Sequence, residues 1–222
     1  MQKIEDVYFI DKNNAPQPNT IIENPTYYKN GYRITHFSMG AQTTAAPVRY
    51  HHLGVYSCSL GQVHIQVYEK HKPVKEITLK PGEFWLRPAH TLCGWYAKED
   101  TVFTIISMRY TANLLPPAEI GGICNVNDLP DIEDNTIKQT RIVDDEYFKL
   151  DFIQLGKNYH YELEEKSSTF VTVIKGDGLF DYHNKTFHLY PEQAFHSYGD
   201  ENTIITTETG LKVLQLIFKD VK

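Results

Sequence analysis

The chain has 222 residues, of which 41% are hydrophobic and 23% charged, and its formal net charge is −6. This composition is that of a folded globular protein and excludes a disordered chain. The acidic balance, with no cluster of Lys and Arg among aromatic residues, argues against nucleic acid as a partner, because phosphate contacts supply most of that affinity. No apolar run approaches the roughly 18 residues that cross a bilayer, so we expect no membrane partner.

The first residues and the cysteines predict the compartment. Residues 1–6 lack the basic start and apolar core of a signal peptide. Cys58, Cys93 and Cys124 are odd in number and far apart, which is unlike a disulfide framework. We therefore predict a cytoplasmic protein with reduced thiols.

The first half of the chain has the texture of β structure. Residues 1–31 are rich in Asn and Pro and are predicted to form an irregular N-terminal arm with one short strand over 7–10. From 32 to 110, short runs of β-branched and aromatic residues alternate with Gly, Pro or charged turns, which is typical of a sandwich or barrel. The strands predicted here are 33–37, 55–60, 63–68, 76–79, 83–86, a short one before 96, and 101–109.

A change of composition separates this half from a second one. Residues 111–146 contain Pro-Pro and Gly-Gly pairs and an acidic run, so we interpret them as a linker with one helical turn. The β texture resumes over 147–222. Its predicted strands are 147–155, 168–175, 178–182, 185–189, 203–207 and 212–218.

The two halves resemble each other. Gly40 lies 21 residues before Gly61, and Gly156 lies 20 residues before Gly176. Each later glycine ends one predicted strand and opens another, and a turn containing Pro follows in each half. Such internal repetition indicates that one barrel has been duplicated.

The glycine and proline spacing resembles the cupin superfamily, specifically a bicupin. Gly82 and Pro88 fall on the first two anchors of the family's second motif. This resemblance implies an all-β fold of two double-stranded β-helix (cupin jelly-roll) barrels in tandem, with few short helices. The barrels would span residues 32–110 and 147–222.

The metal-binding positions of the family motifs are replaced in this chain. Cys93 stands where the second motif has its metal-binding His, and Gly54 stands where the first motif has Glu. Arg49 or Tyr50 falls near the second His of the first motif, and in the second half Thr169 takes the Glu position. The resemblance therefore implies that the metal triads are lost from both barrels.

Four residues nevertheless form a candidate metal site. His51 and His52 are adjacent, so on a strand only one of them points into the barrel. Either could join His90 and Cys93 around Zn²⁺ or Fe²⁺, because imidazole and thiolate are good ligands for these metals. The alternative is a pair of histidines making local hydrogen bonds at a strand end, with no cofactor.

A candidate ligand pocket lies in the first barrel. Val63, Ile65 and Val67 alternate with polar residues, which indicates either a solvent-facing side or a polar barrel interior. An arginine near the rim would suit a carboxylate or phosphate. In the second interpretation the ligand-binding residues are Tyr56, His64, Gln66, Arg87 and Trp95.

Three functions are compatible with these patterns, and whether the protein is an enzyme stays open. We favour a bicupin that binds a small polar molecule, a sugar or an organic acid, in its first barrel. The alternatives are a metal-dependent dioxygenase or isomerase, and an effector-sensing regulatory module without its own DNA-binding domain. Edge strands or the N-terminal arm predict a homodimer.

Overall fold

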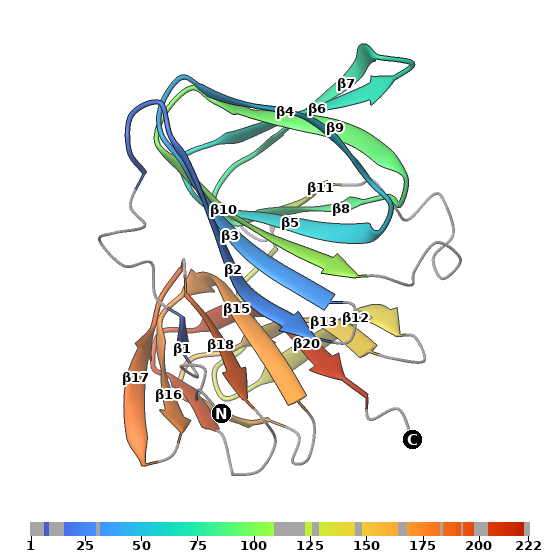
Figure 1. Ribbon diagram of the computed structural model, residues 1–222. Coiled ribbons are helices and arrows are strands. Elements are labelled where there is room, and N and C mark those ends of the chain that lie inside the picture. Colours follow the sequence, from blue (N-terminus) through green and yellow to red (C-terminus); the bar gives the residue numbers. More distant parts are fainter. Residues whose placement is uncertain are drawn as a thin grey trace. The chain divides into compact units, whose positions relative to one another are not determined.

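The computed structural model consists of β-strands, and no helix occurs in the part of the chain that it describes (Figure 1). None of the described residues therefore forms a helix that could span a membrane. The chain divides into two compact units, residues 10–125 and residues 126–222 together with 1–9, called here the N-terminal and C-terminal units. The described residues are 7–8, 16–29, 32–108, 123–125, 129–144, 148–163, 168–182, 184–191, 193–197 and 204–219.

The N-terminal unit has two antiparallel sheets. The six-stranded sheet has the order β11-β8-β5-β10-β3-β2. Its strands are β2 (Ile21–Lys29), β3 (Tyr32–Met39), β5 (Leu53–Leu60), β8 (Glu83–Arg87), β10 (Thr101–Met108) and β11 (Ile123–Asn125). The four-stranded sheet has the order β4-β9-β6-β7. Its strands are β4 (Thr43–Tyr50), β6 (Val63–Glu69), β7 (Lys72–Leu79) and β9 (Thr91–Ala97).

The C-terminal unit repeats this arrangement. Its six-stranded sheet has the order β1-β18-β15-β20-β13-β12, and its four-stranded sheet has the order β14-β19-β16-β17. The first contains β1 (Val7–Tyr8), β12 (Ile137–Asp144), β13 (Phe148–Leu155), β15 (Ser168–Gly176), β18 (Ala194–Ser197) and β20 (Leu211–Phe218). The second contains β14 (Tyr159–Glu162), β16 (Gly178–Tyr182), β17 (Lys185–Leu189) and β19 (Ile204–Thr207).

The strand orders confirm the predicted tandem of two jelly-roll barrels. Each of β2 to β10 has its counterpart ten strands later in the same place in its sheet, and β1 takes the place of β11. The region predicted as an arm contributes β1 to one unit and β2 to the other. The described parts of the region predicted as a linker include β11 and β12.

Two glycines explain why the repeated spacing is visible in the sequence. Gly61 and Gly176 have φ angles of 65° and 89°, which glycine adopts without strain. A Cβ would lie 2.2 Å from the Asp100 carbonyl oxygen at Gly61 and 2.2 Å from the Gly210 carbonyl oxygen at Gly176. Each barrel therefore needs glycine at the end of this strand.

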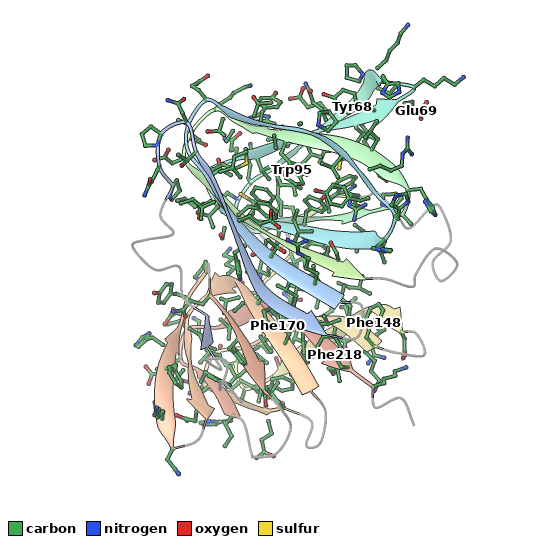
Figure 2. All side chains as sticks on the ribbon, in the orientation of Figure 1. Tyr68, Glu69, Trp95, Phe148, Phe170 and Phe218 are labelled. Atoms are coloured by element: carbon green, nitrogen blue, oxygen red, sulfur yellow. The ribbon has the colours of Figure 1, made fainter. Side chains whose placement is uncertain are left out.

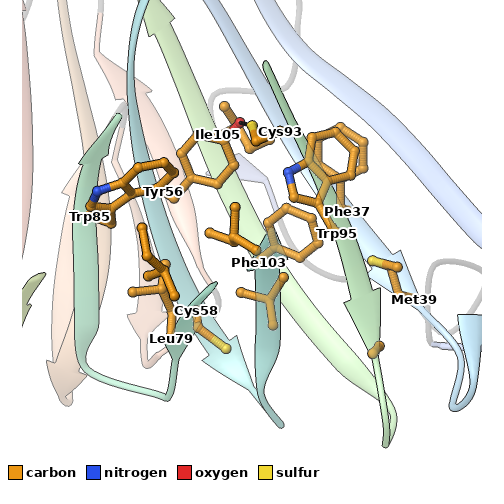
Figure 3. Packing of buried hydrophobic residues seen from close by; sticks show 14 residues of the cluster. Phe37, Met39, Tyr56, Cys58, Leu79, Trp85, Cys93, Trp95, Phe103 and Ile105 are labelled. Atoms are coloured by element: carbon orange, nitrogen blue, oxygen red, sulfur yellow. Dashed lines mark hydrogen bonds between the residues drawn. The ribbon is translucent and has the colours of Figure 1, made fainter. Parts of the chain in front are cut away.

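The interior of the N-terminal unit is packed with aromatic rings (Figure 3). Phe37 and Phe103 stack with centroids 5.0 Å apart, and Trp95 meets both rings. Figure 2 places Trp95 inside the unit, whereas Tyr68 lies at the far end of β6. The buried cluster contains Phe37, Met39, Tyr56, Cys58, Val63, Ile65, Ile77, Leu79, Trp85, Cys93, Trp95, Ala97, Phe103 and Ile105.

Replacing Phe103 with Ala tests this core. Phe103 is fully buried, so we expect Phe103→Ala to lower the free energy of unfolding by about 3–5 kcal/mol. Val74→Ala, on an exposed β7 side chain, should change it by no more than about 0.5 kcal/mol. The chain's two tryptophans, Trp85 and Trp95, both lie in this unit, so urea unfolding followed by tryptophan fluorescence reports it selectively. Equal midpoints for the two variants would contradict the assignment of Phe103 to the core.

Candidate ligand-binding site

One row of side chains on the inner face of the six-stranded sheet carries two arginines. Cross-strand pairing aligns Arg33 on β3 with Ser107 on β10, Ser107 with Gly54 on β5, and Gly54 with Arg87 on β8. The row lies two residues along the strands from Tyr56 and its core neighbours, on the same face. Arg33 is exposed and forms an ion pair with Glu23, so Arg87 is the arginine of this row that lies in the barrel interior.

Arg87 is fully buried and only partly hydrogen-bonded. Its Nη1 donates to the carbonyl oxygens of Tyr50 and Pro88, both at 3.4 Å. Its Cζ lies 4.4 Å from the centroid of the Tyr50 ring and 5.7 Å from that of Tyr56. Its Nε and Nη2 have no hydrogen-bond partner among the described residues, and none of the described carboxylates forms an ion pair with it. A buried cation in this state is costly, because it has lost water without gaining a counterion.

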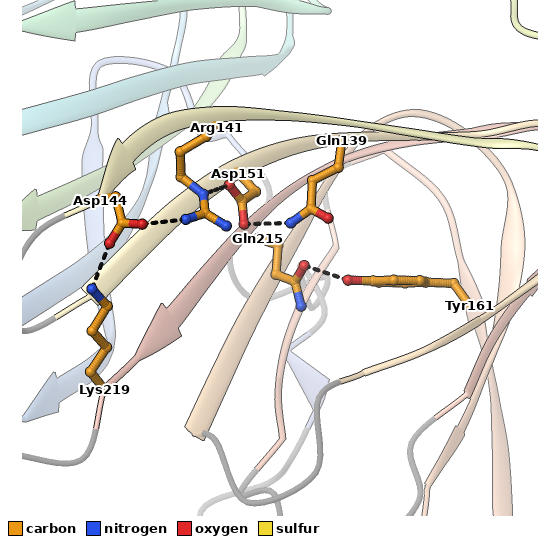
Figure 4. A network of polar contacts seen from close by, with 7 residues as sticks. All are labelled: Gln139, Arg141, Asp144, Asp151, Tyr161, Gln215 and Lys219. Atoms are coloured by element: carbon orange, nitrogen blue, oxygen red, sulfur yellow. Dashed lines mark hydrogen bonds and ion pairs between the residues drawn. The ribbon is translucent and has the colours of Figure 1, made fainter.

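The C-terminal unit provides the contrast of a buried charge that is satisfied (Figure 4). Asp151 is fully buried on β13. It accepts a hydrogen bond from Gln139 Nε2 at 2.7 Å and another from Arg141 Nε, which also makes an ion pair. Arg141 in turn reaches Asp144, whose carboxylate also pairs with Lys219. The same fold therefore pairs a buried charge in one barrel and leaves one unpaired in the other.

Gly54 makes the space that the Arg87 side chain occupies. A Cβ at this position would lie 2.7 Å from Arg87 Nη2 and 3.1 Å from Arg87 Nε. The unpaired edge of the guanidinium therefore faces the place where residue 54 would have a side chain. The guanidinium therefore fills the space beside Gly54, and residue 54 supplies no carboxylate to pair with it.

Two tyrosines and a thiol surround the guanidinium. Burial raises the pKa of Cys93, and the nearby Arg87 cation partly opposes this. Burial likewise raises the pKa of Tyr56 and of Tyr50, and the Cys93 thiol adds to the shift in both while Arg87 opposes it. Tyr56 Oη lies 3.9 Å from Cys93 Sγ. All three groups therefore stay neutral and leave Arg87 without an internal counterion.

The structure brings together three of the five predicted ligand-binding residues. Tyr56 and Trp95 belong to the buried cluster, and Arg87 lies beside Tyr56. His64 and Gln66 lie on the opposite face of β6, because Val63 and Ile65 point into the core. There His64 stacks on Tyr96 and contacts Thr78 and Glu76, and Gln66 accepts a hydrogen bond from Tyr68. The interior side of β6 is therefore apolar, and its polar residues lie on the opposite face of the strand.

The four predicted metal ligands do not converge. The rings of His51 and His90 meet edge to face with centroids 5.7 Å apart, but both residues and His52 are exposed. Cys93 is buried beside Tyr56 instead. In the described part of the chain, no group of three or more His, Cys, Asp or Glu residues could hold a metal ion.

The positions at which cupins carry metal ligands do not fit a metal here. Gly54 has no donor atom, and the guanidinium of Arg87 lies against it. Arg49 or Tyr50 falls near the second His position; Arg49 is itself a cation, and Tyr50 and Cys93 lie near Arg87. A divalent metal would be repelled by Arg87 and would lack the three protein ligands that such sites require. We therefore assign no step to a metal.

The second barrel has no equivalent of this site. Register alignment places Ser197 where the first barrel has Arg87, and Thr169 where it has Gly54. Both residues are buried and uncharged. The unpaired cation is therefore a feature of the first barrel.

Gly54, Tyr50 and Ser107 were not predicted as site residues. Counting along the family motif had identified Gly54 and Tyr50 only as lost metal positions. The signal available in the sequence was Arg87 itself, a charged residue next to an apolar strand segment. Its neighbours depend on cross-strand register.

Comparisons with known proteins agree with this fold. No family model matches the chain, and no curated protein matches its sequence. A cupin 2 conserved barrel domain protein from Leptotrichia buccalis has a TM-score of 0.76 at 12% identity, over 98% of both chains. Salicylate 1,2-dioxygenase from Pseudaminobacter salicylatoxidans has a TM-score of 0.64 at 12% identity, over 91% of this chain and 77% of the other. Vicilin from Corylus avellana (hazelnut) has a TM-score of 0.58 at 12% identity, over 96% of this chain and 85% of the other.

These likenesses identify the chain as a cupin-fold protein with two barrels in tandem. They confirm the fold that the glycine and proline spacing predicted. At this identity they establish the fold alone, so function rests on the site itself.

Replacing Arg87 with Met tests whether the cation is unpaired. We expect Arg87→Met to raise the free energy of unfolding by about 1 kcal/mol or more, because a side chain of similar length then fills the space without a desolvated charge. Arg49→Met, at an exposed arginine of the same unit, should stay within about 0.5 kcal/mol of the parent protein. Urea unfolding at pH 7 measures both. A loss of several kcal/mol in Arg87→Met would mean that the cation is already compensated.

Proposed function

We propose that the protein binds a small organic acid at the mouth of its first barrel, with Arg87 as the partner of the ligand's carboxylate. The observation that carries this proposal is the fully buried guanidinium whose Nε and Nη2 have no hydrogen-bond partner among the described residues. The guanidinium therefore provides the positive charge of an ion pair, and an anionic ligand would provide the negative charge. Binding of an anion would recover the desolvation cost that folding has left.

The orientation of the guanidinium favours a carboxylate over a sugar. Nε–H and Nη2–H lie parallel on one edge of an arginine, and this edge binds both oxygens of a carboxylate. Nη1 is the nitrogen that is already hydrogen-bonded to main-chain carbonyls. The free edge is therefore the bidentate one, and a neutral sugar hydroxyl would leave the charge uncompensated.

The surroundings favour an acid with an apolar body. The aromatic rings of Tyr50, Tyr56 and Trp95 lie near one another beside the guanidinium. Salicylate 1,2-dioxygenase, one of the similar structures, acts by its name on an aromatic carboxylate. The aromatic rings and this likeness both suggest an aromatic acid as the probe. That this protein binds an aromatic acid is our proposal.

Access to the site requires movement of side chains. Arg87 has no exposed surface, whereas Tyr50, whose ring stacks on it, is half-buried. The free edge lies against Gly54, so a ligand's carboxylate would reach Nε and Nη2 once the Tyr50 ring is displaced and the guanidinium moves away from Gly54. We therefore place the entrance at this end of the barrel.

The metal-dependent dioxygenase or isomerase is the weaker alternative. It would need donor atoms around a metal, and the corresponding positions hold Gly54, Tyr50 and Cys93 beside a fixed cation. Catalysis by the protein's own side chains has no observation in its favour. Reversible binding, as in a carrier or effector sensor, is the function that the site supports best.

Binding of benzoate provides the test, with benzamide as the matched neutral ligand. Isothermal titration should show one benzoate bound to the parent protein, with benzamide at least tenfold weaker. Arg87→Lys keeps the charge but not the paired donors, so it should weaken benzoate binding at least tenfold, and Arg87→Met should abolish it. Salicylate, pyruvate and succinate rank the acids by size and shape. Equal affinities for benzoate and benzamide, or unchanged binding in Arg87→Met, would overturn the proposal.

Gly54→Asp provides an internal test of the same geometry. In both Gly54→Asp and Gly54→Asn the new Cβ would lie 2.7 Å from Arg87 Nη2, so the guanidinium has to shift. Only the Asp carboxylate can then form an ion pair with it, so Gly54→Asp should be more stable at pH 7 than Gly54→Asn, which adds the same bulk without charge. The ion pair lowers the folded-state pKa of that carboxyl below its ordinary value of about 3.9, so its contribution is present above pH 4 and is lost as the pH falls through the folded-state pKa. Urea midpoints at several pH values measure the difference. Equal stability of the two variants at pH 7 would show that residue 54 does not face the cation.

A further inference from the structure

A second charged cavity lies in the C-terminal unit and has no part in the site described above. Its volume is about 280 Å³. The charged residues that line it, among those that the structure describes, are Lys157, Lys175, Lys212 and Asp131. Three cations against one carboxylate leave a net positive lining.

Two of these lysines are cross-strand neighbours. Lys175 on β15 and Lys212 on β20 are cross-strand partners in adjacent antiparallel strands, next to a β-bulge between Val173 and Lys175. Like charges in this relation destabilise a sheet pair. On the other side of Lys212, its partner on β13 is the neutral Gln154. An anion between the two ammonium groups would remove the repulsion.

Lys212 is held in place and is almost entirely buried. Its Nζ donates to the Leu129 carbonyl oxygen at 3.0 Å and lies 3.4 Å from Asp131 Oδ1. The Lys212 side chain is 8% exposed, whereas that of Asp131 is 91% exposed. Solvent screens a carboxylate so exposed, so this ion pair contributes little, and the Leu129 carbonyl and the other contacts of Lys212 hold its ammonium in place.

Glycines leave the backbone around the cavity uncovered. Gly176 and Gly210 line it with φ angles of 89° and 100°, which disfavour any residue with a side chain. Gly156 also lines it, and a Cβ there would lie 2.1 Å from the Glu133 carbonyl oxygen. Three residues of the lining therefore contribute backbone and no side chain.

We propose that this cavity binds a small dianion, either inorganic phosphate or a dicarboxylate, between Lys175 and Lys212 with Lys157 at its edge. Both ligands carry two negative charges and so match a lining with a net positive charge. This site is independent of the carboxylate site of the first barrel, because all of its lining residues belong to the C-terminal unit.

A purely structural role of the lysines makes a different prediction. Lys212 and Gln154 bind the carbonyl oxygens of Leu129 and Pro130 and so anchor that segment. Lys157 and Lys175 make no ion pair with a described residue. If the cluster were structural, these two residues would be dispensable for anion binding, and the experiment therefore changes them and leaves Lys212 intact.

The experiment measures binding of phosphate and of malonate by isothermal titration at constant ionic strength set with sodium chloride. It uses the full chain carrying Arg87→Met, so that anion binding at the first-barrel site cannot contribute to the measured heat. The result is then independent of whether the function proposed for that site is correct. We expect one anion per chain, with affinity at least tenfold weaker in Lys175→Gln and weaker again in the double variant with Lys157→Gln. Lys185→Gln, at an exposed lysine of β17 outside the cavity, should bind as tightly as its parent.

The two anions distinguish the sources of the ligand. Tighter phosphate binding assigns the site to phosphate, and tighter malonate binding assigns it to a dicarboxylate; either result supports the proposal if it depends on Lys175. Without ligand, Lys175→Gln should be at least as stable as its parent, because the like-charge pair is gone. No binding of either anion, or binding that Lys175→Gln and Lys185→Gln weaken equally, would overturn the proposal.

Discussion

Desolvation of the Arg87 guanidinium is the constraint around which the first barrel is arranged. The cation is fully buried, it donates two long hydrogen bonds to main-chain oxygens, and it stacks on Tyr50. These contacts offset part of the cost of removing it from water, and Nε and Nη2 stay unsatisfied within the described structure. An unsatisfied buried guanidinium lowers the free energy of unfolding, and a loss of stability of this kind is typical of functional sites.

The rest of the barrel holds this cation in position. The stacked rings of Phe37 and Phe103, with Trp95 against them, form a rigid layer next to the row that contains Arg87. Antiparallel pairing of β5 with β8 places Gly54 opposite Arg87, so the side chain has room to lie across the neighbouring strand. The C-terminal unit has the same strand order, and its register position equivalent to Arg87 is Ser197. Duplication therefore supplied two scaffolds, and only the first carries an unpaired cation at this place among the described residues.

The sequence predicted the repeated fold well, because the features that define it are local. The glycines at 61 and 176 are needed for their φ angles, and their spacing is visible without a structure. Several edge strands, β4 and β12 among them, were missed for the opposite reason. β4 and β12 pair on one side only and have mostly exposed side chains, so they lack the apolar alternation of a buried strand.

The site was predicted in part, because cross-strand neighbours are not encoded by spacing along the chain. Arg87 was predicted to bind a carboxylate or phosphate, and this stays a prediction, but the position of Gly54 beside it depends on register between β5 and β8. Alternation along β6 correctly separated His64 from Val63, yet could not decide which of them faces the interior. In the structure the β-branched side chains of Val63 and Ile65 are buried, so these residues face the interior.

The measurement that tests the account most directly is the NMR resonance of the Arg87 Nε–Hε group in protein labelled with ¹⁵N-arginine. Its loss in Arg87→Met assigns it, and benzoate is then titrated in with benzamide as the control. The account predicts that Hε of Arg87 moves strongly downfield with benzoate and stays in place with benzamide, because the proton becomes bonded to a carboxylate oxygen. A resonance that benzoate leaves unchanged while it binds elsewhere would contradict the assignment of Arg87 as the ligand's partner.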